Sequence, residues 1–343
     1  MRRFTTLATI GLSLLAAAAP YSAAGDTGGV PDVDREAARG LEFLAGQQSK
    51  DGAFTDKGQR VAVTGLGLLA FLAAGDGPDV GRYGANVRAA IDFLVQQAPA
   101  DGYFGKVDGS LMYGHAIATL ALAEAWGLEE TDARRRQISR VVQLAVRVIL
   151  DAQKVAKPPQ VGGGWGYEPP AAESNLPLSA WNALALRAAL QCGVDVPPAA
   201  IVRATGFLLK CRHPGGGFTY QPGVDDASIA ETGAAVVCLY LMDPSASAGQ
   251  TDSIQYLRDH PIDDQTPYPF YAGYYSAMAA QEAGEPAWSA IAGSVFKRLL
   301  KMQQPDGSWK ASRPGEETGV PYATAMAVLT LETPDRLLPV FQR

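Results

Sequence analysis

The feature that most constrains this chain is a sequence motif that recurs along most of its length. Six copies, spaced 40 to 60 residues apart, share an apolar-periodic stretch, a polar turn and then an aromatic residue. The clear copies, with Gln-Gln before a turn containing Gly, are 41–54, 91–104 and 299–309, and the weaker copies are 148–165, 207–218 and 254–271. Self-similarity at such a period is typical of folds built from stacked, similar units. The 343 residues therefore fit one repeat-built domain as well as they fit two ordinary domains.

Each copy is followed by a second apolar segment of a different character. The first kind is amphipathic: within 137–153, Ile138 and Val142 lie on an apolar stripe, and Arg140 lies off it. The second kind, such as VAVTGLGLLAFLAAG at 61–75, is apolar on nearly all sides and rich in Ala and Gly, which is typical of buried, closely packed helices. The inner helices are expected at 61–75, 113–127, 179–193, 227–242, 271–284 and 322–332.

No strand pattern accompanies these segments, so the sequence predicts an all-α fold. Outer and inner helices alternate six times, and one hairpin cannot bury its inner helix alone. We therefore predict an α6/α6 toroid, a closed ring of six helical hairpins that spans residues 35–343.

The N-terminal residues have the features of a secretory signal peptide. Arg2 and Arg3 form a basic start, 7–19 is apolar, and small residues at Ser22 and Ala24 offer a cleavage site. We expect a signal peptide at 1–24, a linker at 25–34 and export to the periplasm or the outside. An uncleaved interfacial anchor is the alternative. The apolar run is too short for a confident membrane span, and no transmembrane span is expected in the mature chain.

Charge and cysteine content narrow the choice of ligands and partners. Of 29 Lys and Arg residues two lie in the signal peptide, leaving 27 against 35 Asp and Glu, a net charge of −8. This balance argues against nucleic acid as a partner, because binding phosphates requires clustered cations. The sequence has only three Cys and three His, which are few possible ligands for a metal centre, and no metal or cofactor is expected. At most one disulfide can form among Cys192, Cys211 and Cys238, and Cys238 has the surroundings of a small buried hydrophobe.

The turn motifs carry a resemblance to a known superfamily. They share a Gln, a Gly four residues later and an aromatic residue two residues after that: Gln48, Gly52 and Phe54 in the first copy, and Gln303, Gly307 and Trp309 in the last. They resemble the Gln-Trp motifs of squalene and oxidosqualene cyclases, and the repeat as a whole resembles the prenyltransferase and squalene-oxidase repeat superfamily. The segments at 112–115, 163–167 and 338–343 resemble those of a secreted bacterial branch of this superfamily. The resemblance implies an α/α toroid, in which the parallel inner helices gather their N-termini at one mouth of a cavity.

The resemblance also implies a candidate acid at the start of the expected inner helix 227–242. Asp225 and Asp226 lie in a stretch similar to the Asp-x-Asp-Asp-Thr-Ala motif of protonation-initiated terpene cyclases, although Gly223 replaces the first Asp and Ala-Ser replaces Thr-Ala. By that match Asp225 would protonate an alkene or epoxide, and Asp226 would tune it. Adjacent carboxylates in an apolar cavity resist double ionisation, which keeps a proton available. The alternative is that both acids merely cap and open a helix.

Other polar and aromatic residues are expected to line the cavity because they lie near the starts of inner helices. They are Tyr113, His115, Trp181, Glu231, Tyr271, Tyr274, Tyr275 and Tyr322. The aromatic rings could stabilise a cation, although aromatic residues at helical spacing more often serve packing. His115 is either a proton acceptor or a hydrogen-bonded core residue.

Three classes of function follow from these patterns. The first is acid-initiated terpene cyclisation of a hydrophobic small molecule. The second is a non-catalytic ring that binds a lipid, peptide or partner protein. The third is a glycan-processing α/α toroid, in which Glu231 would pair with Asp225 or Asp226. Zinc-dependent prenyl transfer and diphosphate ionisation are disfavoured, because the sequence contains neither Asp-x-Cys nor Asp-Asp-x-x-Asp.

Overall fold

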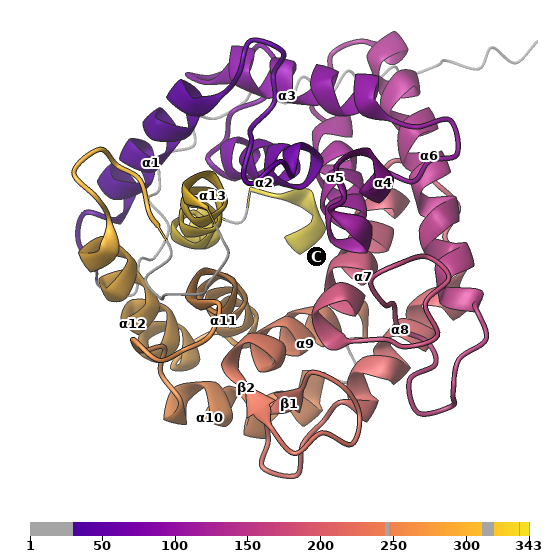
Figure 1. The fold of residues 1–343 in the computed structure, drawn as a ribbon. Helices are drawn as coiled ribbons and strands as arrows, with labels where there is room; N and C mark the ends of the chain where they lie inside the picture. Colours follow the sequence, from indigo (N-terminus) through magenta and orange to yellow (C-terminus); the bar gives the residue numbers. More distant parts are fainter. Residues whose placement is uncertain (1–29, 244–246, 311–318, 336, 343) are drawn as a thin grey trace, which may run out of the picture.

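The helices of this protein form a closed ring around a central opening (Figure 1). The computed structural model describes residues 30–243, 247–310, 319–335 and 337–342, so the expected signal peptide lies outside the described residues. The outer helices are α1 (Val33–Gln47), α3 (Gly84–Gln97), α6 (Asp132–Lys154), α8 (Pro198–Lys210), α10 (Thr251–Asp259) and α12 (Ala287–Met302). The inner helices are α2 (Arg60–Ala73), α5 (Leu111–Trp126), α7 (Leu176–Gln191), α9 (Ile229–Met242), α11 (Pro269–Ala283) and α13 (Val320–Leu331). The predicted all-α toroid is confirmed.

The remaining elements are short. They are helix α4 (Gly105–Asp108), the 3-10 turns η1 (Ser247–Gln250), η2 (Thr333–Asp335) and η3 (Pro339–Phe341), and the antiparallel pair β1 (Phe218–Thr219) and β2 (Ala227–Ser228). In the β pair, Phe218 is opposite Ser228. No helix in the described ranges is long and apolar enough to cross a membrane.

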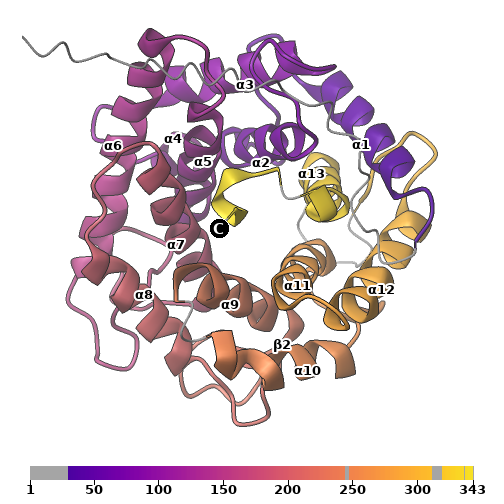
Figure 2. The ribbon, with the colours of Figure 1, turned by 180° about the vertical axis from the view of Figure 1, so that it is seen from behind.

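The inner helices pack side by side and close on themselves. α2 packs on α5, and the contacts continue through α7, α9, α11 and α13 back to α2. Both views show this inner layer within the outer one (Figure 2). Each inner helix is buried nearly all round, as in α2, where every residue after Arg60 is buried. The ring is therefore the arrangement that removes these apolar helices from water.

In five of the six hairpins a recurring turn packs against the next outer helix of the ring. In the last copy Gly307 has φ 86°, and a Cβ atom there would lie 2.5 Å from the backbone oxygen of Arg39, so only Gly fits. Two residues later a buried aromatic residue donates its backbone N–H to an inner-helix side chain, as Trp309 does to Thr324 Oγ1 at 3.0 Å. The same bond joins Phe54 to Thr64, Phe104 to His115, Trp165 to Ser179 and Phe218 to Thr232.

The glutamine of the motif ties one repeat to the next. Gln303 Nε2 donates to Gly307 O at 3.0 Å in its own turn and to Glu36 O at 2.8 Å on α1. Gln48 makes the corresponding pair of bonds to Gly52 O and Asn86 O. The indole of Trp309 donates to Leu299 O at 2.8 Å on its own outer helix. Because Gln303 lies at the end of α12 and Glu36 lies on α1, these bonds close the ring.

The C-terminal segment 337–342 runs into the ring opening at the C-terminal ends of the inner helices (Figure 1). Leu338, Val340 and Phe341 are buried there. Arg187 of α7 donates from Nε to Val340 O at 2.9 Å, and Glu124 of α5 accepts the Val340 N–H at 3.1 Å. The tail thereby closes the end of the ring opposite the inner-helix N-termini.

Candidate active site

A cavity of about 620 Å³ lies at the N-terminal ends of the inner helices, and all six of them contribute to its wall. This volume is in the range of small-molecule sites. The lining residues are Asp56, Lys57, Gln59, Ala62, Val63, Leu66, Gly109, Ser110, Leu111, Tyr113, Ile117, Tyr167, Pro177, Trp181, Tyr220, Ala230, Glu231, Tyr268, Tyr271 and Tyr322. Five of the eight residues expected to line a cavity do so: Tyr113, Trp181, Glu231, Tyr271 and Tyr322.

The wall is mainly aromatic and aliphatic. The ring of Trp181 lies 6.5 Å from that of Tyr271 and 5.6 Å, edge-on, from that of Tyr275, measured between centroids. Tyr275 is fully buried, does not line the cavity and packs edge-on against Trp181. Trp181 therefore has a fixed orientation, and its ring is available to a ligand in the cavity.

Two further tyrosines on the wall, Tyr167 and Tyr220, were not predicted. Their hydroxyl groups are 2.9 Å apart, and the Tyr167 ring lies 6.0 Å from that of Tyr113. Each follows the aromatic residue of a repeat turn by two positions, after Trp165 and Phe218 respectively. That spacing is the signal in the sequence that would have found them.

Glu231 brings a carboxyl group into this aromatic wall. It lies in the first turn of α9, where Ser228 Oγ accepts the Glu231 N–H at 3.2 Å and so caps the helix. Burial raises the pKa of Glu231, and the nearby charge of Asp226 adds to this, against the opposing effect of Glu231's own backbone N–H. Within the part of the chain that the structure describes, no Lys or Arg forms an ion pair with Glu231. The carboxyl therefore keeps its proton to a higher pH than an exposed glutamate does.

The other carboxyl in the lining has a structural role. Asp56 lies in the loop before α2, and its Oδ2 accepts the backbone N–H of Gly319 at 2.6 Å, just before α13 begins. In residues 30–243, 247–310, 319–335 and 337–342, no group of three or more His, Cys, Asp or Glu side chains is placed to hold a metal ion.

Asp225 and Asp226 lie outside the cavity, which corrects the expected location of the candidate acid. The Asp225 side chain is 96% exposed and accepts a hydrogen bond from His213 Nε2 at 2.8 Å. Asp226 is also exposed, and neither acid caps α9, since Ser228 does. The pairing of Phe218 with Ser228 turns the expected first helical turn into a strand. The two acids are thereby held in a surface hairpin.

Three other predicted lining residues, His115, Tyr274 and Tyr275, are buried in the packing instead. His115 Nδ1 accepts the Phe104 N–H at 3.3 Å, and Nε2 lies 3.1 Å from Ala145 O on α6. These bonds assign the proton to Nε2, and burial lowers the pKa of His115 to about 4. The core interpretation of His115 is thus the one the structure supports. Tyr274 lies toward the C-terminal tail, beside a small void that Leu338 and Phe341 also line.

The cysteines are all buried and free. Burial raises the pKa of Cys192 and of Cys211 to about 12. Cys238 is fully buried in α9, as its apolar surroundings predicted.

Comparison with known proteins gives the fold a context. No protein-family model matches the chain. Drimenyl diphosphate synthase from Streptomyces showdoensis is 25% identical over 287 residues, which are 79% of this chain and 48% of that protein. The chain thus spans about half the length of this curated relative.

Solved structures of enzymes from two different classes share the fold of this chain. The type II terpene cyclase MstE from Scytonema matches with a TM-score of 0.58 and 13% identity, over 91% of this chain and 100% of that chain. An inactive variant of an α-1,6-mannanase from Salegentibacter sp. matches with a TM-score of 0.60 and 12% identity, over 89% and 100%. At such identities the solved structures show the fold alone. The resemblance to the terpene cyclase-like α/α toroid superfamily is confirmed at that level.

Proposed function

We propose that this protein binds an isoprenoid-type hydrophobic molecule in the 620 Å³ cavity and that Glu231 transfers a proton to it. The observation that carries the proposal is the half-buried carboxyl of Glu231 within an aromatic wall, with its pKa raised by burial. Asp225 was the candidate from sequence, but its side chain is exposed and lies outside the cavity.

The comparisons support this choice of ligand over a sugar. A variant of the Scytonema cyclase was solved in complex with geranylgeranyl dihydroxybenzoate, its substrate. The curated relative is a drimenyl diphosphate synthase. The mannanase shares the fold, but a glycan would leave most of its hydroxyl groups unpaired against Val63, Leu66 and Ile117.

The chemistry follows from the state of the carboxyl. Protonated Glu231 gives its proton to an acceptor atom of the ligand and becomes a carboxylate, and the positive charge moves to the ligand. The aromatic rings of Trp181 and Tyr271 line the cavity, where they can stabilise a cation and exclude water. Loss of a proton from the cation ends the reaction, and the carboxylate takes a proton up again. Each unit of raised pKa costs about 1.4 kcal/mol of driving force, so an epoxide or another activated acceptor suits Glu231 better than a plain alkene.

Isotope incorporation tests the proposal directly. The protein would be incubated in D2O with squalene, oxidosqualene and geranylgeraniol, and the products analysed by gas chromatography and mass spectrometry. From an alkene we expect a rearranged product with one carbon-bound deuterium, and from the epoxide a rearranged product whose deuterium lies on the exchangeable hydroxyl group. Glu231→Gln, which keeps the size of the side chain but cannot donate that proton, should give neither product.

Asp225→Asn is the matched control, because it removes a carboxyl that lies outside the cavity, and it should retain full turnover. Turnover by Glu231→Gln equal to wild type would refute the role of Glu231. Tight binding of an unchanged lipid by both proteins would favour the non-catalytic ring. Glu231-dependent release of reducing sugar from mannan or starch would favour the glycan-processing class.

Export is part of the same proposal and rests on the sequence of residues 1–24. N-terminal sequencing of the protein recovered from the native cell envelope tests it. A mature chain that begins near Gly25 is expected, and a chain that retains Met1 would contradict cleavage. A partner protein on the ring remains the alternative to a small-molecule ligand.

A further inference from the structure

In five of the six repeats the buried aromatic residue of the turn is inserted between helices, and we call this residue the aromatic wedge. The wedges are Phe54, Phe104, Trp165, Phe218 and Trp309, and the fifth repeat lacks one. In the sixth repeat Trp309 bonds Leu299 O on its own outer helix and Thr324 on its inner helix. A Cβ atom at Gly40 of the next outer helix would lie 2.7 Å from the Trp309 ring. The wedge thus fills the space between an outer helix, its inner helix and the next outer helix.

The connection after α10 is built differently. Residues 260–268 read HPIDDQTPY, with no Gly and with a single aromatic residue, Tyr268. Tyr268 is 60% exposed and lies at the large cavity instead of under the helices. Since Tyr268 points elsewhere, the wedge position between α10 and α12 receives no aromatic side chain from this connection.

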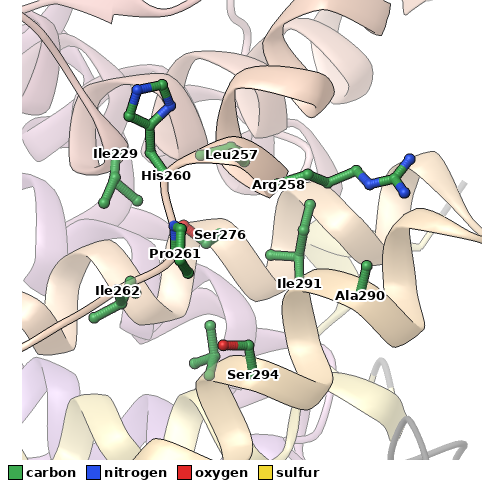
Figure 3. A pocket seen from close by; sticks show the side chains of 11 residues that line it. Ile229, Leu257, Arg258, His260, Pro261, Ile262, Ser276, Ala290, Ile291 and Ser294 are labelled. Carbon is green, nitrogen blue, oxygen red and sulfur yellow. The ribbon is translucent and has the colours of Figure 1, made fainter.

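A pocket of about 70 Å³ remains at that position. Its wall comes from the three kinds of element that surround Trp309: Leu257 of α10, Ser276 of α11, and Ile291 with Val295 of α12 (Figure 3). One water needs roughly 10–15 Å³ of such space, so the pocket has room for about five to seven water-sized atoms. That is about the size of one six-membered ring.

The floor of the pocket carries an unsatisfied hydroxyl group. Ser276 is 2% exposed, and its Oγ has no hydrogen-bond partner among the described residues. A buried polar group without a partner costs about 1–3 kcal/mol. A ligand that forms a hydrogen bond with this hydroxyl removes that cost, which favours binding. The side chains of Arg258 and His260 also border the pocket, and Figure 3 shows both extending away from Ile291.

We propose that this pocket is a second binding site, which takes a phenol-type ring with its hydroxyl directed to Ser276 Oγ. The ring occupies the wedge position, packs against Leu257, Ile291 and Val295, and replaces what Phe or Trp supplies in the other repeats. The site is independent of the large cavity, because no residue lines both.

Methyl NMR with labelled isoleucine distinguishes the two sites within one spectrum. Ile262 and Ile291 line the pocket, whereas Ile117 lines the large cavity. Titration with p-cresol should shift the Ile262 and Ile291 methyl signals at concentrations that leave Ile117 unchanged. Toluene, which lacks the hydroxyl, should bind about threefold to tenfold more weakly, as expected for one hydrogen bond.

Two variants test the contacts. Ser276→Ala should bring p-cresol down to the affinity of toluene. Ser294→Trp, at an exposed position on the pocket wall, should cover the pocket and abolish the shifts, while Ser289→Trp on the same helix outside the wall should not. Shifts confined to Ile117, or no shift at 10 mM p-cresol, would overturn the proposal. If Ser294→Trp unfolds, its spectrum shows this, and equal p-cresol affinity in Ser276→Ala and wild type still overturns it.

Discussion

Replacing Glu124 by Gln should flatten the pH dependence of folding stability above pH 5. Glu124 is 1% exposed in α5, and burial raises its pKa to about 8 against the opposing effects of the Val340 N–H and Arg187. The unfolded chain ionises this carboxyl near 4.5. Between these values the native state holds a proton that the unfolded state has released. The free energy of unfolding therefore falls as pH rises through this window, by up to about 1.4 kcal/mol per pH unit.

Between pH 5 and 7.5 the contribution of Glu124 amounts to about 3 kcal/mol. Gln keeps an oxygen that accepts the Val340 N–H but cannot ionise, so the variant should gain about that much stability relative to wild type across the range. Urea unfolding followed by circular dichroism at several pH values measures the difference. Burial also raises the pKa of Glu332 to about 8, but this residue is present in both proteins and cancels. A difference that stays constant with pH would refute the reasoning.

Three further changes test the packing of the repeats. Trp309→Ala should cost about 3–5 kcal/mol, the usual penalty for a buried Trp, and an unchanged melting temperature would contradict the wedge role. Gly307→Ala should destabilise strongly, since its Cβ would lie 2.5 Å from Arg39 O; the control Gly206→Ala, in a helix with open space around it, should be neutral or stabilising by about 0.5–1 kcal/mol. The pKa of His115, about 4 in the fold against 6.5 unfolded, makes this residue's own contribution to stability fall as pH drops from 6.5 to 4, opposite in sign to that of Glu124. His115→Gln should therefore gain up to about 3 kcal/mol relative to wild type over that range, and a difference between the two proteins that does not change between pH 6.5 and 4.5 would disprove it.

The ring fold could be predicted because the sequence features that determine it are local. Helical periodicity, the glycine of each turn and the aromatic residue two positions later are all visible along the chain. The fully apolar character of 61–75 predicted an inner helix, and the structure places α2 at Arg60–Ala73. The glutamine of the motif is visible in the same way, and Gln303 bonds Glu36 O on α1.

The site was harder to predict, because the positions of its residues depend on contacts between segments that are distant in the sequence. The inner helix was expected to begin at residue 227 with Asp225 and Asp226 at its start, but Ala227 and Ser228 pair with Thr219 and Phe218, and α9 begins at Ile229. Strands of two residues are too short to be predicted from the sequence pattern. Glu231 was identified as a lining residue, and the structure places it in the cavity wall. His115 takes the position of Thr64 in the first repeat, a substitution that is visible only when the repeats are aligned on their aromatic residues.

The contact between α2 and α13 has a consequence for how the chain is made. These helices pack together in the finished ring, yet α2 ends at Ala73 and α13 begins at Val320. At a ribosome speed of roughly 5–20 residues per second, the second partner emerges about 12–50 seconds after the first. Throughout that interval the flank of α2 that later packs on α13 lacks this contact. Each nascent chain therefore exposes an apolar surface that can aggregate. A truncation before α13 leaves this flank exposed permanently, and we expect such a chain to aggregate instead of folding as a shorter ring.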